Sequence, residues 1–138
     1  MINLTDLNYL AVAVAAIASF ALGSLWYSPL LFSKTWQKEL GFTDEYIREA
    51  NMGKIFGTSF ILFIAASLGV ALFFQIIGTN KIDWLLGMLY GFLIGVAFVS
   101  TTMGINMLYQ RRSFKLWAID AFYQIICFCI MGLIISVW

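Results

Sequence analysis

Asp120 is the residue of this sequence that could most readily do chemistry, because it is a charged side chain inside a long apolar stretch. It is the only Asp, Glu, Lys or Arg in residues 116–138. Charged residues inside membrane-spanning segments are costly, and they commonly mark ion, proton or ligand sites. Facing the interior of a helix bundle, Asp120 could bind a cation, a proton or the polar head of a lipid. The polar cluster predicted around it comprises Asp120, Asn106, Tyr123, Gln124, Tyr27 and Ser28.

A second interpretation of Asp120 stays open at this stage. The residue lies four positions past Leu116, which is about 6 Å along a helix axis and therefore near the edge of the apolar run. At that depth the carboxylate could pair with the basic residues of the preceding loop, which include Arg112 and Lys115. It would then only anchor its helix at the membrane interface.

Several other kinds of chemistry are not indicated. The chain has no histidine, which excludes histidine-based triads and His-ligated metals, and no phosphate-binding or nucleophile-elbow motif occurs. Cys127 and Cys129 would point about 200° apart on a helix, which argues against a disulfide between them. The few basic residues are scattered, unlike a nucleic-acid patch. We expect no metal, cofactor or nucleic-acid partner and favour a non-enzymatic protein, although Asp120 or a tyrosine could still act on a lipid.

The elements that must position these residues are four long apolar runs. Of 138 residues, 62% are hydrophobic and 11% are charged, whereas about a quarter of a soluble domain is charged. Spans are predicted at residues 8–27, 54–78, 84–110 and 116–138, each long enough for a bilayer core. Backbone groups in lipid must be paired within the segment, so the spans should be helices. The sequence predicts one all-α domain over residues 1–138, an integral membrane four-helix bundle with the lipid bilayer as its partner.

Orientation follows from the basic residues of the short loops. Seven of them flank the first and third connections and one lies on the other side: Lys34, Lys38, Arg48, Lys54, Arg111, Arg112 and Lys115 against Lys81. This predicts a cell-membrane protein with those two loops in the cytoplasm and both termini outside. No basic residue precedes Lys34 and the first run is long, so we expect it to be a retained span rather than a cleaved signal peptide.

The segment between the first two spans, residues 29–52, is predicted to hold a short interfacial helix. Pro29 should begin it after the cap Ser28, and Gly41 should end it. Phe32 and Trp36 fall on one side of this helix, which favours an amphipathic helix on the membrane surface. A helix folded under the bundle as a plug is the alternative. A further helix capped by Thr43 is expected to continue into the second span.

Aromatic and basic residues form a predicted interfacial collar at this end of the molecule. Its members are Trp26, Pro29, Lys34, Trp36, Lys115 and Trp117. The order Tyr, Phe, Lys, Trp after the first span recurs as Tyr109, Phe114, Lys115 and Trp117 after the third, which is consistent with a two-plus-two repeat. Cytoplasmic helix ends commonly carry such residues, so the similarity also has a simpler explanation.

Small residues recur at four-residue steps in two spans and predict close helix contacts. One seam comprises Ala11, Ala15, Ser19 and Gly23, and the other comprises Gly87, Gly91 and Gly95. These contacts could lie within one chain or between copies, and we expect a homo-oligomer. Helical periodicity also places Thr102 and Asn106 on the face of Gly95. The short connection at residues 79–83 predicts that the second and third spans are antiparallel neighbours.

Three stretches, WYSPLLFSKTW, EANMGKIFGTSF and RRSFKLWAIDAFYQ, resemble domain-of-unknown-function family 1761 over nearly the whole chain. The resemblance implies a small prokaryotic-type, bacterial inner-membrane protein of about four spans, and it implies no activity. It also suggests signature positions, which are Trp26, Tyr27, Ser28, Pro29, Lys34, Trp36, Lys115 and Asp120.

Three functions are compatible with the sequence, and a structure should separate them. A dry, tightly packed interior would favour a self-associating protein held by the small-residue seams. A polar cavity that reaches Asp120 would favour a transport or permeation unit for a small solute, cation or proton. A groove open sideways to lipid and lined by Trp26, Tyr27 and Trp36 would favour a lipid-binding protein.

Overall fold

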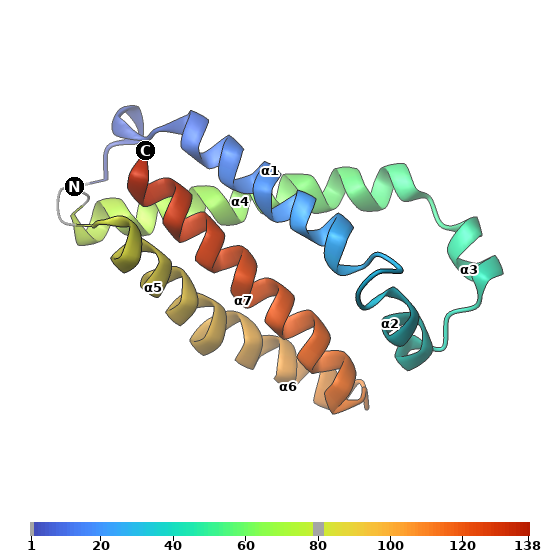
Figure 1. Ribbon diagram of the computed structural model, residues 1–138. Helices are drawn as coiled ribbons and strands as arrows, with labels where there is room; N and C mark the ends of the chain where they lie inside the picture. The colour runs from blue at the N-terminus through green and yellow to red at the C-terminus, as the bar shows by residue number, and fades with distance from the viewer. Residues whose placement is uncertain (1, 79–81) are drawn as a thin grey trace.

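The computed structural model describes residues 2–78 and 82–138, and it is helical throughout that part of the chain (Figure 1). Four stretches of helix are long and apolar enough to cross a membrane, which confirms the all-α four-helix prediction. Their boundaries lie within two residues of the predicted ones. The elements are η1 (Leu4–Asp6), α1 (Tyr9–Trp26), α2 (Ser33–Leu40), α3 (Asp44–Glu49), α4 (Met52–Ile77), α5 (Trp84–Ile94), η3 (Gly95–Ser100), α6 (Thr101–Tyr109) and α7 (Phe114–Val137).

Each long helix begins at a polar side chain that caps its first turn. The caps are Asn8 to the Ala11 amide at 3.1 Å, Asn51 to Lys54 at 3.0 Å, Asp83 to Leu86 at 2.8 Å, and Ser113 to Leu116 at 3.1 Å. The first amides of a helix have no partner within it, and a side-chain oxygen satisfies one of them. These four residues therefore determine where the apolar runs become helical.

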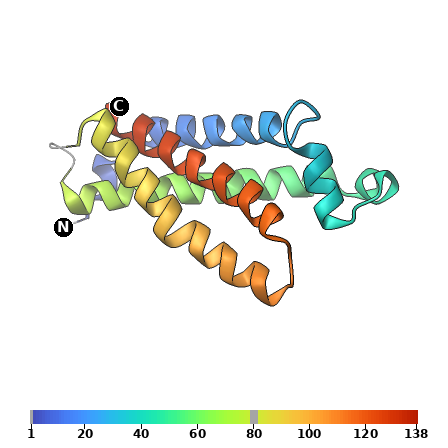
Figure 2. The ribbon, with the colours of Figure 1, turned by 60° about the horizontal axis from the view of Figure 1, so that its bottom comes forward.

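The two ends of the bundle are different. Asn3 exchanges two hydrogen bonds with the Gln75 side chain, and the Asn8 amide donates to the Trp138 carbonyl at 3.3 Å, so the termini share one end with the last turn of α4 (Figure 1). The opposite end holds α2, α3 and the turn from α6 to α7, where Ser113 donates to Glu39 (Figure 2). Every described Lys and Arg belongs to this second end, which we call the basic end. Residues 79–81, including Lys81, lie outside the described part of the chain.

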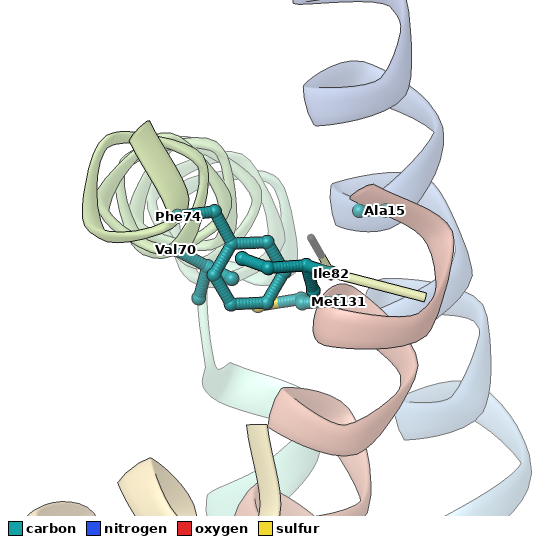
Figure 3. Packing of buried hydrophobic residues seen from close by; sticks show 5 residues of the cluster. All are labelled: Ala15, Val70, Phe74, Ile82 and Met131. Atoms are coloured by element: carbon teal, nitrogen blue, oxygen red, sulfur yellow. The ribbon is translucent and has the colours of Figure 1, made fainter. Parts of the chain in front are cut away.

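The core lies near the termini, where α1, α4 and α7 converge. Ala15, Val70, Phe74, Ile82 and Met131 form its buried cluster, and Figure 3 shows the last four packed together with Ala15 to one side. α7 is the central helix, since it packs along α5 on one side and α1 on the other. α4 and α5 meet in an aromatic contact of Phe73 and Phe74 with Tyr90. The predicted neighbour relationship of the second and third spans is therefore limited to the region of the core, because the main partner of α5 is α7.

The short helix after the first span starts later than predicted. α2 begins at Ser33, and Pro29 instead lies in a tight turn, in which the Leu31 amide donates to the Ser28 carbonyl at 3.1 Å. Proline at the second position of such a turn has the backbone angle that the turn needs. The predicted stop at Gly41 is confirmed: Gly41 has a φ of 72° and is followed by a backbone bond from Phe42 to Gln37.

α3 does not continue into α4 as the sequence suggested. Thr43 caps α3 as predicted, with its hydroxyl accepting from the Tyr46 amide at 3.1 Å, but the helix ends at Glu49. Ala50 is extended, and Asn51 then begins a new helix by capping the Lys54 amide. An asparagine favours a cap over a helix interior because its side chain competes for the backbone amides.

The third span contains a π-helical segment, η3, between α5 and α6. A π-helix carries an extra residue per turn, which rotates everything after it by about 100° relative to a regular α-helix. The face toward α7 accordingly runs through Gly87, Gly91, Gly95, Ser100 and Gly104, with one five-residue step. Thr102 and Asn106 are exposed. The prediction that they share a face with Gly95 is wrong, because it assumed regular periodicity through this segment.

Candidate functional site

Asp120 is tied to the end of α1 by a direct hydrogen bond. The Tyr27 hydroxyl donates to Asp120 Oδ1 at 2.7 Å, and the neighbouring Trp26 indole donates to the Ile119 carbonyl at 3.1 Å. Tyr27 directly follows the last turn of α1, and Asp120 lies in the second turn of α7. Asp120 is half-buried. The two adjacent contacts hold its carboxylate at the junction of two spans rather than out in the basic loop.

This junction forms part of the wall of a large cavity. The cavity has a volume of about 1180 Å³ and lies at the basic end, between the last turns of α1, the first half of α4 and the first turns of α7, with α2 and α3 beside it. Met103 of α6 borders it on the far side of α7. The residues that carry its chemistry are Asp120, Tyr27, Tyr123, Gln124, Ser24, Ser33, Ser59, Trp36, Gln37 and Glu49.

Six aromatic side chains form a continuous wall of this cavity. Centroid distances along it are 6.3 Å from Phe63 to Tyr123, 5.2 Å from Tyr123 to Tyr27, 5.5 Å from Tyr27 to Trp36, 5.8 Å from Trp36 to Phe42 and 4.6 Å from Phe42 to Tyr46. Most of these pairs meet edge to face, the arrangement that suits the ring quadrupoles. The wall links α4, α7, α1, α2 and α3 through one chain of contacts.

The charges in the cavity have a single sign. Among the described residues that line it, the charged ones are Asp120 and Glu49. Lys34 and Lys38 of α2 are exposed, and the Arg48 guanidinium donates back to the Asp44 carbonyl at 3.4 Å. The cavity thus combines an acidic group with a mainly aromatic surface.

Residues 10–136 match the family described as "Protein of unknown function (DUF1761)". The chain belongs to this family. The match covers almost all of the sequence, as the resemblance of the three stretches suggested. Neither the curated proteins nor the solved structures contain a match to it.

The DUF1761 fold brings together part of the predicted polar cluster. Asp120, Tyr27, Tyr123 and Gln124 all line the cavity. Ser28 is half-buried beside it, and its hydroxyl accepts from the Leu30 amide at 3.3 Å. Asn106 is elsewhere, on a separate groove of α6 that it shares with Thr102 and Gln110. The π-helical segment turns Asn106 away from the cavity, so Asn106 does not belong to the polar cluster around Asp120.

Polar contacts continue from Asp120 toward the middle of the DUF1761 bundle. The Tyr123 hydroxyl donates to the Ser19 carbonyl at 3.1 Å, and Ser19 in turn donates to the Cys127 carbonyl at 3.5 Å. The Ser67 hydroxyl is buried on α4 with no hydrogen-bond partner among the described residues. Beyond this level, toward the termini, the bundle is filled by the core of Figure 3.

The residues of the predicted collar do not form one continuous surface. Trp26 and Trp36 turn inward, with Trp26 stacked on Phe32 at 4.7 Å. The Trp117 indole donates to the Ser100 carbonyl at 2.9 Å and joins α7 to η3. Pro29, Lys34 and Lys115 are exposed. Trp36, which the sequence assigned to the interface, therefore lines the cavity, whereas Trp26 packs beside it against Phe32 and Tyr123.

Both small-residue seams are occupied within one chain. Ala11, Ala15 and Ser19 are buried on α1, which packs against α4 and α7, and a methyl group on Gly23 would approach the Tyr123 hydroxyl to 2.6 Å. Gly87, Gly91 and Gly95 all face the α7 backbone. Glycine permits this close approach of helices in lipid.

Sequence analysis missed the contribution of α3 and α4 to the cavity. Phe42 and Tyr46 come from the loop and first turn around α3, and Phe56, Ser59 and Phe63 come from α4. The spacing of these residues was the available signal: Tyr46 follows Phe42 by four residues, Ser59 follows Phe56 by three, and Phe63 follows Ser59 by four. Such steps occur in any amphipathic helix, so only the fold assigns them to one cavity.

Proposed function

We propose that this DUF1761 protein is a multi-pass membrane protein that binds an amphiphilic molecule in the cavity at Asp120. The observation that carries the proposal is the cavity itself, a space of about 1180 Å³ whose wall joins a carboxylate to six aromatic rings. Ligand pockets are typically lined by apolar and aromatic groups with a few polar groups that orient the ligand. Asp120, Tyr27 and Gln124 would serve the polar end of such a ligand, and the aromatic wall its apolar part.

The position of the cavity supports entry from the membrane. Met52, Ile55 and Phe56 of α4 line it and are themselves exposed, and Met103 borders it from α6. These side chains would give the cavity an apolar rim on the side of the bilayer. A ligand with an apolar part could therefore reach the cavity sideways, between α4 and α6, without leaving the bilayer.

We place the basic end in the cytoplasm of the cell and both termini outside. All seven described Lys and Arg lie at that end, and basic residues in short loops are retained on the cytoplasmic side. In this orientation the cavity lies in the cytoplasmic half of the membrane, and the amphipathic helix α2 lies at the inner surface.

Transport is the second candidate, supported by the polar contacts that continue from Asp120 to Cys127. Against it, the bundle toward the termini is closed by Val70, Phe74 and Met131. Transport would require this core to separate in a second conformation. Binding requires only the conformation described here, and we therefore prefer it.

We also propose that copies of the chain associate through α4 instead of through the predicted seams. Gly57 and Gly69 are exposed on this helix, and a methyl group on either would meet nothing within 4 Å in the described part of the chain. Ala65 continues the same face at a four-residue step. Each glycine costs helix stability, about 1 kcal/mol relative to alanine, and a partner helix would offset that cost.

The binding proposal is tested by filling the cavity. The purified protein in phosphatidylcholine nanodiscs is titrated with N-phenyl-1-naphthylamine, a neutral fluorescent amphiphile, and the signal of empty nanodiscs is subtracted. We expect saturable binding that Ser59→Trp abolishes, because Ser59 lines the cavity. Ala97→Trp, on an exposed position of η3, is the matched control and should bind as the wild type does. Equal binding by Ser59→Trp and wild type would refute the proposal.

A further inference from the structure

We infer that the cavity selects lipophilic cations, that is, molecules with one positive charge carried on a bulky apolar body. The inference rests on the proposed binding function and adds the chemical class of the ligand. It depends on three features of the site: the sign of its charges, its aromatic lining, and the absence of a competing cation among the described residues that line it.

The sign of the charge is set by Asp120. Its hydrogen-bonding neighbours are neutral: the Tyr27 hydroxyl donates to its Oδ1, and the Trp36 indole lies close enough to act as a second donor. A carboxylate half-removed from water in a membrane-spanning segment is costly when it has no counter-charge. A bound cation would supply one. Glu49, which also lines the cavity near α3, adds a second group of the same sign.

The basic residues of this end do not fill that role. Lys34 and Lys38 are exposed on α2 and do not line the cavity. Arg48 precedes Glu49, but its guanidinium is turned back to the Asp44 carbonyl. The seven described cations of the basic end thus surround the cavity without entering it, and the interior keeps its acidic character.

The aromatic wall suits the same ligand. Tyr27 contacts Asp120 directly, and Trp36 and Tyr123 pack edge to face against the Tyr27 ring, so the carboxylate lies beside a cluster of three rings. The negative face of an aromatic ring attracts a cation, most strongly for tryptophan, and quaternary ammonium groups are bound in cages of this kind. An anionic amphiphile would meet repulsion from both the rings and the carboxylates.

The volume favours a bulky ligand over a bare ion. The space of about 1180 Å³ is partly open to the outside, and it is large enough for a ligand of the kind that occupies pockets of roughly 300–1,000 Å³. A small inorganic cation would leave most of this aromatic surface without contact. A cation on a multi-ring or branched apolar body would cover the wall and place its charge beside Asp120.

The test uses three probes of similar shape and different charge: tetraphenylphosphonium, tetraphenylborate and neutral triphenylphosphine oxide. Each is titrated into the full-length protein in phosphatidylcholine nanodiscs by calorimetry, with empty nanodiscs subtracted. We expect tetraphenylphosphonium to bind at least about tenfold more tightly than the other two. Asp120→Asn should remove this preference, whereas Glu45→Gln, an equal charge change on an exposed residue outside the cavity, should leave it unchanged.

A second variant protects the test from a folding defect in Asp120→Asn. Trp36→Leu keeps an apolar side chain in the wall and should weaken tetraphenylphosphonium binding more than triphenylphosphine oxide binding. Equal affinities for the three probes, all abolished by Ser59→Trp, would overturn the cation preference and leave the amphiphile cavity intact. Failure of all three probes to bind would overturn both this inference and the proposed function.

Discussion

The Tyr27 hydroxyl and the Asp120 carboxylate, 93 residues apart in the chain, are joined by a hydrogen bond of 2.7 Å. This contact links the end of α1 to the second turn of α7 and leaves the carboxylate at the edge of a large cavity. The carboxylate therefore faces a tyrosine of another span.

Removing the Tyr27 hydroxyl should destabilise the bundle. Hydrogen bonds to charged groups contribute about 1.5–3 kcal/mol, so we expect Tyr27→Phe to lower the free energy of unfolding in detergent by an amount of this order. Asp120→Asn should cost a similar amount, and the double variant should cost less than the sum. Additive losses would show that the two side chains do not interact. Tyr109→Phe, at an exposed residue, is the control and should have no effect.

The contact between α5 and α7 should tolerate no side chain at Gly91. A methyl group there would overlap the Phe128 backbone, and backbone atoms cannot move aside as a flexible side chain can. We expect Gly91→Ala to destabilise the protein by about 1–3 kcal/mol despite the better helix propensity of alanine. Gly69→Ala, whose methyl group would meet nothing within 4 Å, should be neutral or stabilising. Thermal unfolding in detergent measures both, and equal stability of the two variants would contradict the packing.

The predicted orientation can be measured with single cysteines. In a background with Cys127 and Cys129 replaced by alanine, Thr5→Cys should react with a membrane-impermeant maleimide in intact cells. Arg112→Cys should react only after the membrane is opened, because it lies at the basic end. The reverse pattern would place the termini in the cytoplasm and move the cavity to the outer half of the membrane.

Association through α4 should be sensitive to bulk on its exposed face. We expect Gly57→Leu and Gly69→Leu to reduce cross-linked dimers in native membranes, because leucine would keep a second helix from approaching closely. The stability of the single chain should not fall, since a side chain at either position would meet nothing within 4 Å in the described part of the chain. Ala97→Leu, on an exposed position of the third span, is the matched control. Dimers that persist in both α4 variants would argue against this interface.

The helices themselves could be predicted because the reasons for them are local. An apolar run of about 20 residues in lipid has to pair its backbone groups internally, and this requirement does not depend on the rest of the chain. Gly41 ended α2 and Thr43 capped α3 as expected, since both act on neighbouring residues. Pro29 and Asn51 are local signals too, but each is compatible with more than one backbone conformation. In the structure Pro29 lies in a turn, and Asn51 begins a new helix.

The membership of the site was decided by tertiary structure. Asn106 is polar and was predicted to lie in the same half of the membrane as Asp120. The π-helical segment nevertheless rotates it away from Asp120. Phe42 and Tyr46, which nothing in the sequence related to Asp120, complete the aromatic wall. The composition and the spacing of residues were enough to predict the lipid surroundings, the four spans and the places where most helices begin. The helix faces that pack together depend on contacts between distant segments and on the π-helical segment. Neither can be predicted from the regular spacing of residues along a helix.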